Sequence, residues 1–172
     1  MKSSFKTKDI VSTFRPLELL HIDLFGPVNT ASLYGSKYGF VIVYDYSGWT
    51  WVKFLRSRDN AYDVFSSFCT QIQSEKETKI LKVRSDHGGE FENEPFETFC
   101  QKHGIVHEFS SRRTPQQNEV VERKNKTSQD MARTMIHENN LAKHFWAEAV
   151  NTTCYVHENN LAKHFNHSDQ SS

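Results

Sequence analysis

The strongest constraint on this chain is an aspartate placed inside an otherwise apolar strand. Residues 17–25 alternate in character, with Leu20, Ile22 and Leu24 on one face and Asp23 on the other. A carboxylate in such a segment is costly unless a charged or polar group meets it. The segment therefore predicts a strand that packs one face into a core and presents Asp23 to a site.

Two further acidic residues follow in order. Asp86 comes just after a short apolar stretch at 80–83, and Glu122 lies on a predicted long helix, with 35 residues between the two. Taken singly, Asp23 fits a satisfied buried acid, Asp86 fits ordinary turn composition, and Glu122 fits a solvated helix surface. Three carboxylates brought together repel one another, and a pair of divalent cations would hold them. Two hard cations on oxygen ligands carry out phosphodiester chemistry.

The order and spacing of these motifs resemble the catalytic core of retroelement integrases, the D-D-35-E polynucleotidyl transferases, and most closely the copia-type integrases of plants. The resemblance covers residues 16–156. It rests on four segments, which are HIDLFGP at 21–27, SDHGGEF at 85–91, TPQQN at 114–118 and VERKN at 121–125. A plain ribonuclease H-type nuclease would share the chemistry, but the glutamine-rich loop and the 35-residue interval favour an integrase.

The resemblance implies a catalytic and metal-binding triad of Asp23, Asp86 and Glu122 that holds two Mg²⁺ or Mn²⁺ ions. It also implies two successive reactions, trimming of element ends and strand transfer into target DNA. The DNA-binding residues that follow from it and from the local charge are Arg113, Gln117, Asn118, Arg123, Lys124 and Lys126. Further expectations are a homo-oligomer in a complete integrase, no membrane association, and an intracellular chain that functions in the nucleus.

The periodicity along the chain predicts an α/β protein. Strands are expected at 17–25, 38–46, 49–55, 80–83 and 105–109, and helices at 59–75, 93–104, 114–137 and 143–156. Ser47 and Gly48 form a plausible hairpin turn. The buried stripe of the long helix is expected to contain Val121, Met131, Ala132 and Met135. This order fits a mixed five-stranded sheet flanked by helices, the ribonuclease H-like fold that the resemblance implies.

Composition narrows the class of protein. A length of 172 residues allows one domain with a core, and no apolar run approaches the length of a membrane span. The three cysteines, Cys69, Cys100 and Cys154, form no C-x-x-C pair and are expected to be small core residues rather than zinc ligands. Because the resembled integrases have a zinc module before the core, we expect the chain that begins at Met1 to be a fragment of such a protein.

Charge is unevenly distributed although the formal net charge is zero. Residues 112–133 gather six basic side chains around Glu122, which predicts a phosphate-binding surface. The alternative is a solvated helix face whose charges bind nothing. Residues 1–15 are polar and are interpreted as a linker that precedes the core at 16–156.

Three departures from the resembled pattern favour a second hypothesis. Glu119 stands where the family has glycine, and Ser128 leaves a polar gap in the buried stripe. The sequence HENNLAKHF occurs at 137–145 and again, identically, at 157–165. We interpret residues 157–172 as a duplicated segment with a polar tail outside the core. The alternative function is therefore a degenerate, non-catalytic transposon fragment that retains only weak nucleic-acid binding.

Overall fold

A five-stranded mixed sheet organises the computed structural model, which describes residues 17–110 and 116–155. The strands are β1 (Leu19–Phe25), β2 (Tyr38–Tyr44), β3 (Thr50–Leu55), β4 (Lys82–Ser85) and β5 (Val106–Phe109). They lie in the order β3-β2-β1-β4-β5, with β2 antiparallel to both β1 and β3 and with β4 parallel to both β1 and β5. The predicted fold class, a five-stranded mixed sheet with flanking helices, is observed.

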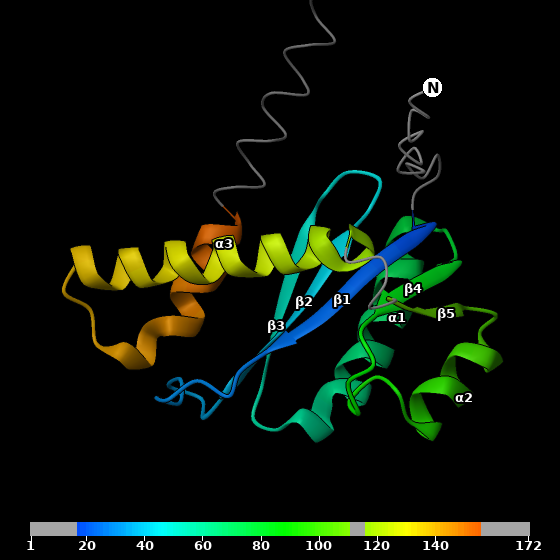
Figure 1. Cartoon of the computed structure of the whole chain (residues 1–172), viewed down its shortest axis with the longest axis horizontal. Helices are drawn as coiled ribbons and strands as arrows, with labels where there is room; N and C mark the ends of the chain where they lie inside the picture. The colour runs from blue at the N-terminus through cyan, green and yellow to red at the C-terminus, as the bar shows by residue number, and fades with distance from the viewer. Residues whose placement is uncertain (1–16, 111–115, 156–172) are drawn as a thin grey trace, which may run out of the picture.

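Helices cover both faces of this sheet. They are the 3₁₀ turn η1 (Arg58–Asn60), α1 (Ala61–Lys76), α2 (Glu94–Lys102), α3 (Gln116–Glu138) and the 3₁₀ turn η2 (Lys143–Phe145), after which residues 146–155 are helical. In Figure 1, α3 crosses one face of the sheet while α1 and α2 lie on the other.

The alternation of β1 divides the core into two clusters. Leu20 and Ile22 pack with α1 and α2, in a cluster that includes the fully buried Phe40, Phe65 and Phe96. Phe25 packs on the opposite face with Val121 of α3 and with Trp146. Asp23 has the same parity as Phe25, so β1 directs its carboxylate toward α3.

The start of α1 and the hairpin between β2 and β3 differ from expectation, because local hydrogen bonds determine where these elements begin and end. Ser57 accepts a hydrogen bond from the backbone N–H of Asp59 while the Asn60 side chain accepts one from the Ser57 N–H, and this capping box forms a 3₁₀ turn before α1 begins. At the predicted hairpin, Gly48 adopts φ +73° and donates to the Tyr44 carbonyl at 2.7 Å, which shortens both strands.

The buried stripe of α3 was predicted with one error. Val121 and Ala132 are buried and Met135 packs partly against them, but Met131 is 38% exposed. Met131 lies on the flank of the helix, where its long side chain reaches a surface pocket instead of the core.

Two further predictions concern segments that lie outside the described residues. They are the polar linker at 1–15 and the duplicated segment and tail at 157–172. The three cysteines are free and buried, as predicted for core residues. Among the described residues, no helix combines the length and the apolar character needed to cross a bilayer.

Candidate functional site

Asp23 and Asp86 meet at one edge of the sheet because their strands are parallel neighbours. The pairing of β1 with β4 advances from Leu19 opposite Lys82 to His21 opposite Arg84. Continued by two residues, the same register brings Asp23 level with Asp86, which follows the last residue of β4. The first two acidic motifs of the sequence therefore converge through strand pairing alone.

Helix α3 brings the third acidic residue to the same edge. Asn125, which is 6% exposed, donates a hydrogen bond from Nδ2 to Asp23 Oδ2 at 2.9 Å. Gln129, one turn further along α3, donates to Asn125 Oδ1 at 2.6 Å and fixes that amide. Glu122 lies about one turn before Asn125 and therefore on a neighbouring part of the same helix face. Its own side chain is exposed to solvent.

The pKa of Asp23 reflects both its burial and its acidic neighbours. It is raised to about 6, chiefly by burial and in smaller part by the charges of Asp86 and Glu122, against the opposing hydrogen bonds from Asn125 and the Leu24 backbone. A buried carboxylate beside two others is unfavourable when all are ionised, and a cation between them would relieve the repulsion.

The turn after β4 holds Asp86 in place. The Gly88 N–H donates to Asp86 Oδ1 at 2.8 Å. A Cβ added to Gly88 would lie 2.7 Å from Glu90 Oε1 and 2.9 Å from Asp86 Oδ1, so a side chain at position 88 would displace these carboxylates. Glu90 is thus a fourth acidic residue at this turn, with a side chain only 9% exposed and a contact of 3.7 Å to Arg58.

The donors available at this edge suit a hard divalent cation. Asp23, Asp86 and Glu122 offer only carboxylate oxygens, which Mg²⁺ and Mn²⁺ prefer. Within residues 17–110 and 116–155, no group of three His, Cys, Asp or Glu side chains is already arranged to hold a metal ion. Asp23 and Asp86 are fixed by the sheet and by hydrogen bonds, whereas the exposed Glu122 has room to change its rotamer.

The predicted DNA-binding residues have mixed positions. Arg123 and Lys126 are exposed on α3, and Lys124 is half-buried, with its Nζ 4.0 Å from where a Cβ on Gly48 would lie. Arg123 pairs with Glu119 across one helical turn. Arg113 lies outside the described residues, as do the side chains of Gln117 and Asn118.

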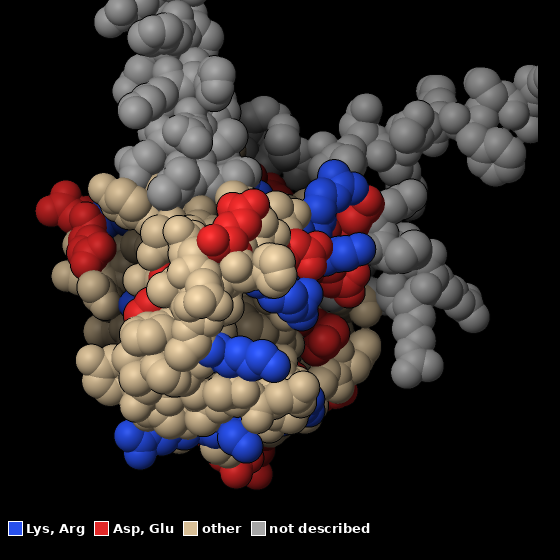
Figure 2. Space-filling view, turned by 90° about the vertical axis from the view of Figure 1, so that its left-hand side faces the viewer, with Lys and Arg blue, Asp and Glu red and all other residues tan. Residues whose placement is uncertain are grey.

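Basic charge on the protein surface does not form a single patch in the face shown in Figure 2. Lysine and arginine side chains intermingle there with acidic ones. On α3, Asp130 pairs with Arg133 at 3.0 Å in addition to the pair between Glu119 and Arg123. Of the four basic residues of the predicted phosphate-binding segment that the structure describes, two are therefore already matched by an acidic neighbour.

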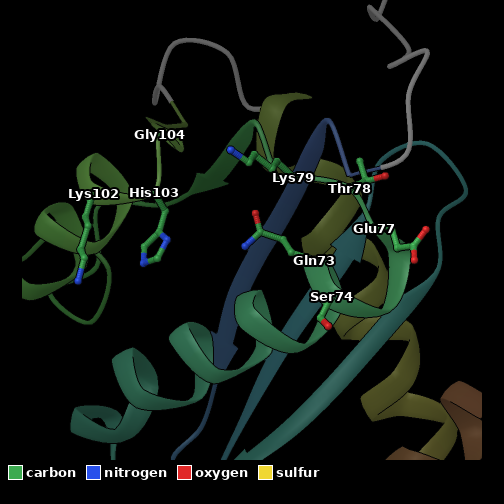
Figure 3. A pocket seen from close by; sticks show the side chains of 8 residues that line it. All are labelled: Gln73, Ser74, Glu77, Thr78, Lys79, Lys102, His103 and Gly104. Carbon is green, nitrogen blue, oxygen red and sulfur yellow. The ribbon is translucent and has the colours of Figure 1, made fainter.

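A large hollow in the described structure lies elsewhere. It has a volume of about 720 Å³ and opens between the C-terminal ends of α1 and α2, where Gln73, Lys79 and His103 are among its lining residues (Figure 3). The hollow lies near the residues that precede β4 and β5, at the N-terminal ends of these strands, whereas Asp86 follows the C-terminal end of β4. The hollow is therefore separate from the acidic site.

Sequence reasoning missed two residues that organise the site. Asn125 belongs to the VERKN segment, and its spacing of three residues from Glu122 was the signal that it shares the site. Glu90 belongs to the SDHGGEF segment but was given no role of its own, because its burial depends on how the loop after β4 folds back.

Comparison with known proteins identifies the group to which these features belong. A family model described as the integrase core domain matches residues 14–115, more than half of the chain. The chain is 39% identical over 140 residues to the retrovirus-related Pol polyprotein from transposon TNT 1-94 of Nicotiana tabacum. It is 28% identical over 147 residues to the transposon Ty1-NL2 Gag-Pol polyprotein of Saccharomyces cerevisiae.

These alignments include 81% and 84% of the chain but only 10% and 8% of the two relatives, so the chain spans about a tenth of their length. Among solved structures, the chain is similar to the HTLV-2 integrase catalytic core domain in complex with magnesium, in its trimeric form. The TM-score is 0.57 and the identity 18%, over 83% of this chain and 85% of that one.

A second similar structure is the simian T-cell lymphotropic virus intasome in complex with PP2A regulatory subunit B56 gamma. The TM-score is 0.58 and the identity 14%, over 78% of this chain and 47% of that chain. The two structural similarities confirm the ribonuclease H-like fold that the sequence predicted.

Proposed function

Because the chain belongs to the integrase core domain family, we propose that it is the catalytic core of a retrotransposon integrase, a metal-dependent polynucleotidyl transferase that acts on DNA. The observation that carries this proposal is the convergence of Asp23 and Asp86 at one sheet edge, with Glu122 on the helix whose Asn125 bonds Asp23.

Asp23, Asp86 and Glu122 are the residues that would hold two Mg²⁺ or Mn²⁺ ions. When bound, such ions activate a water or a DNA 3′-hydroxyl as the nucleophile and stabilise the leaving 3′-oxygen. The same site would then serve both 3′-end processing and strand transfer, since each is an attack of an oxygen nucleophile on a phosphodiester.

The protein contributes position and charge. Asn125 orients the Asp23 carboxylate, and the Gly88 N–H orients Asp86. Arg123, Lys124 and Lys126, with Arg113, Gln117 and Asn118, are proposed to contact DNA, because phosphate contacts from basic and amide side chains set the register of a nucleic acid. Pre-oriented groups of this kind lower the barrier without moving during the reaction.

The proposal extends to partners and to the extent of the core. DNA, as element ends and as target, would be the main partner, and the complete enzyme would act as a homo-oligomer in the nucleus. Residues 16–156 would form the catalytic core, with the linker at 1–15 and the duplicated segment at 157–172 outside it.

One observation favours the alternative of a non-catalytic fragment that binds nucleic acid weakly. Glu119 pairs with Arg123 and so removes one basic group from the surface beside Glu122. Glu119 and Glu122, which lie within one turn of α3, would also repel DNA phosphate.

The test uses purified protein with short fluorescent duplexes and with Mg²⁺ or Mn²⁺. We expect metal-dependent nicking and strand-transfer products in the parent protein and in Asp130→Asn, an exposed-acid control, and none in Asp86→Asn. If the parent gives no product while still binding DNA, the non-catalytic alternative is correct. Product from Asp86→Asn would refute the proposed metal site.

A further inference from the structure

A column of aromatic rings leads from the core to the surface directly beside Asp86. Phe96 is fully buried and lies 5.0 Å, centroid to centroid, from the ring of His107. The His107 ring is 4.2 Å from that of Phe109, the last residue of β5. The His87 ring then stacks on Phe109 at 4.7 Å with an interplanar angle of only 14°.

His87 ends this column with one face open. Its side chain is 58% exposed, and among the described residues Phe109 is its one ring partner. The imidazole is also fixed in rotation, because Nδ1 lies 3.0 Å from Glu92 Oε2. A planar ring that is packed on one side, held at its edge and open on the other side is a platform for stacking another planar group.

The His87 ring is close to the acidic site because its residues neighbour Asp86 in the chain and in the sheet. His87 follows Asp86 in the chain, and Gly88, which bonds the Asp86 carboxylate, follows His87. Phe109 pairs with Ser85 at the end of β4, so the ring beneath His87 belongs to the same sheet edge as Asp86.

The charge around His87 selects which part of a nucleic acid would stack. The exposed Glu92 and Glu94 follow a few residues later in the chain, and their carboxylates repel phosphate. The flat face of a nucleobase carries no such charge. A base inside a duplex has both faces covered by its neighbours, so the ring is suited to an unpaired base.

We propose that His87, supported by Phe109, is a stacking subsite for an unpaired DNA base next to the phosphodiester that is to react. The subsite deepens the proposed function and rests on it, since it assumes that DNA occupies the acidic site. It would favour frayed or overhanging ends over blunt duplexes.

Binding of short duplexes tests the proposal, with 2-aminopurine placed either in a two-nucleotide overhang or within the paired region. Calcium replaces magnesium so that no strand is cut. We expect the parent protein to quench the overhang probe and to bind the overhang duplex about tenfold more tightly than a blunt one, the size of one base–aromatic stack.

Three variants separate stacking from a merely structural role. His87→Leu still covers Phe109 but offers no aromatic face, and it should lose both the quenching and the overhang preference. His87→Phe should retain them. His103→Leu is the matched control, because His103 is also exposed and lies 4.3 Å from the Phe99 ring at the far end of α2, and it should behave as the parent does.

Retention of the overhang preference in His87→Leu, or its equal loss in His103→Leu, would overturn the proposal, as would failure of the parent protein to bind the overhang duplex. The proposed function fails in a different way. A parent that quenches the overhang probe but shows no metal-dependent nicking retains the stacking subsite without the catalytic role.

Discussion

Asn125 and Asp23 are 102 positions apart in the chain, and the hydrogen bond between them, 2.9 Å from Nδ2 to Oδ2, ties α3 to the central strand of the sheet. The bond lowers the pKa of a carboxylate that burial otherwise raises. It also sets the position of Glu122, one turn away on α3, relative to Asp23. One amide therefore joins two of the three elements of the candidate site, β1 and α3.

Asn125→Ala should raise the pKa of Asp23 above its value of about 6, because the substitution removes the largest opposing contribution. We also expect a loss of about 1–3 kcal/mol in the free energy of unfolding at neutral pH, the usual scale for a hydrogen bond to a charged group. Carbon-13 NMR of the aspartate carboxyls measures the pKa, with Asp23→Asn used to assign the signal. Gln129→Ala, which removes the outer hydrogen bond, should shift that pKa less, and an unchanged pKa in Asn125→Ala would contradict the role given to Asn125.

The sequence contained most of the fold because its strands and helices carry clear periodicity. Residues 17–25 were expected as a strand from the alternation around Asp23, and the structure has β1 at Leu19–Phe25. The α3 helix was expected to end near His137, and it ends at Glu138. The strand order, by contrast, was not predicted, since the hydrophobic pattern of a strand does not specify its neighbour in a sheet.

The parts that sequence reasoning did not reach depend on tertiary contacts. Met131 was expected in the same stripe as Val121 and Ala132, but it is 38% exposed and lies on the flank of the helix, where it lines a pocket with Thr153 and Cys154. Glu119 was interpreted only as a departure from the family's glycine. It lies in the first turn of α3, where a negative charge interacts favourably with the helix dipole and with Arg123.

Asp23→Asn should stabilise the metal-free protein at pH 8 and have little effect near pH 4. The folded-state pKa of Asp23, about 6, lies above the ordinary aspartate pKa of 3.8. The ionised group therefore destabilises the fold as pH rises from about 4 through about 6, by at most about 3 kcal/mol. Denaturant titrations of parent and variant at both pH values measure the difference.

Magnesium should reverse the order of stability of the parent protein and Asp23→Asn at pH 8. We expect Mg²⁺ to raise the melting temperature of the parent at pH 8 and to have less effect on Asp23→Asn, because a ligand that binds only the folded state stabilises it. Asp130→Asn, which changes an exposed acid, serves as the control and should respond as the parent does. An equal response to Mg²⁺ in Asp23→Asn would show that Asp23 is not a ligand.

Glu119→Gln should strengthen DNA binding several-fold at low salt. The change removes one negative charge beside Glu122 and releases Arg123 from its ion pair, so that the guanidinium is available to phosphate. Fluorescence anisotropy with a short duplex at two salt concentrations measures the gain, which should shrink at the higher salt. Glu119→Gly removes the same charge but also weakens the first turn of α3 by about 1 kcal/mol. If only Glu119→Gly improved binding, backbone freedom rather than charge would be the cause.

Ser128→Leu should raise the free energy of unfolding by about 1 kcal/mol. Ser128 is half-buried, its Oγ lies 3.4 Å from Cys154 Sγ, and both residues line a pocket of about 20 Å³ between α3 and the segment at 146–155. Leucine would fill that pocket and extend over Met131, with a gain limited by the small volume available. Ser128→Ala is the control, because it removes the hydroxyl and improves helix propensity without filling space. Denaturant midpoints should rank Leu above Ala and Ala above the parent. A leucine variant less stable than the alanine variant would show that the pocket does not expand to accept the larger side chain.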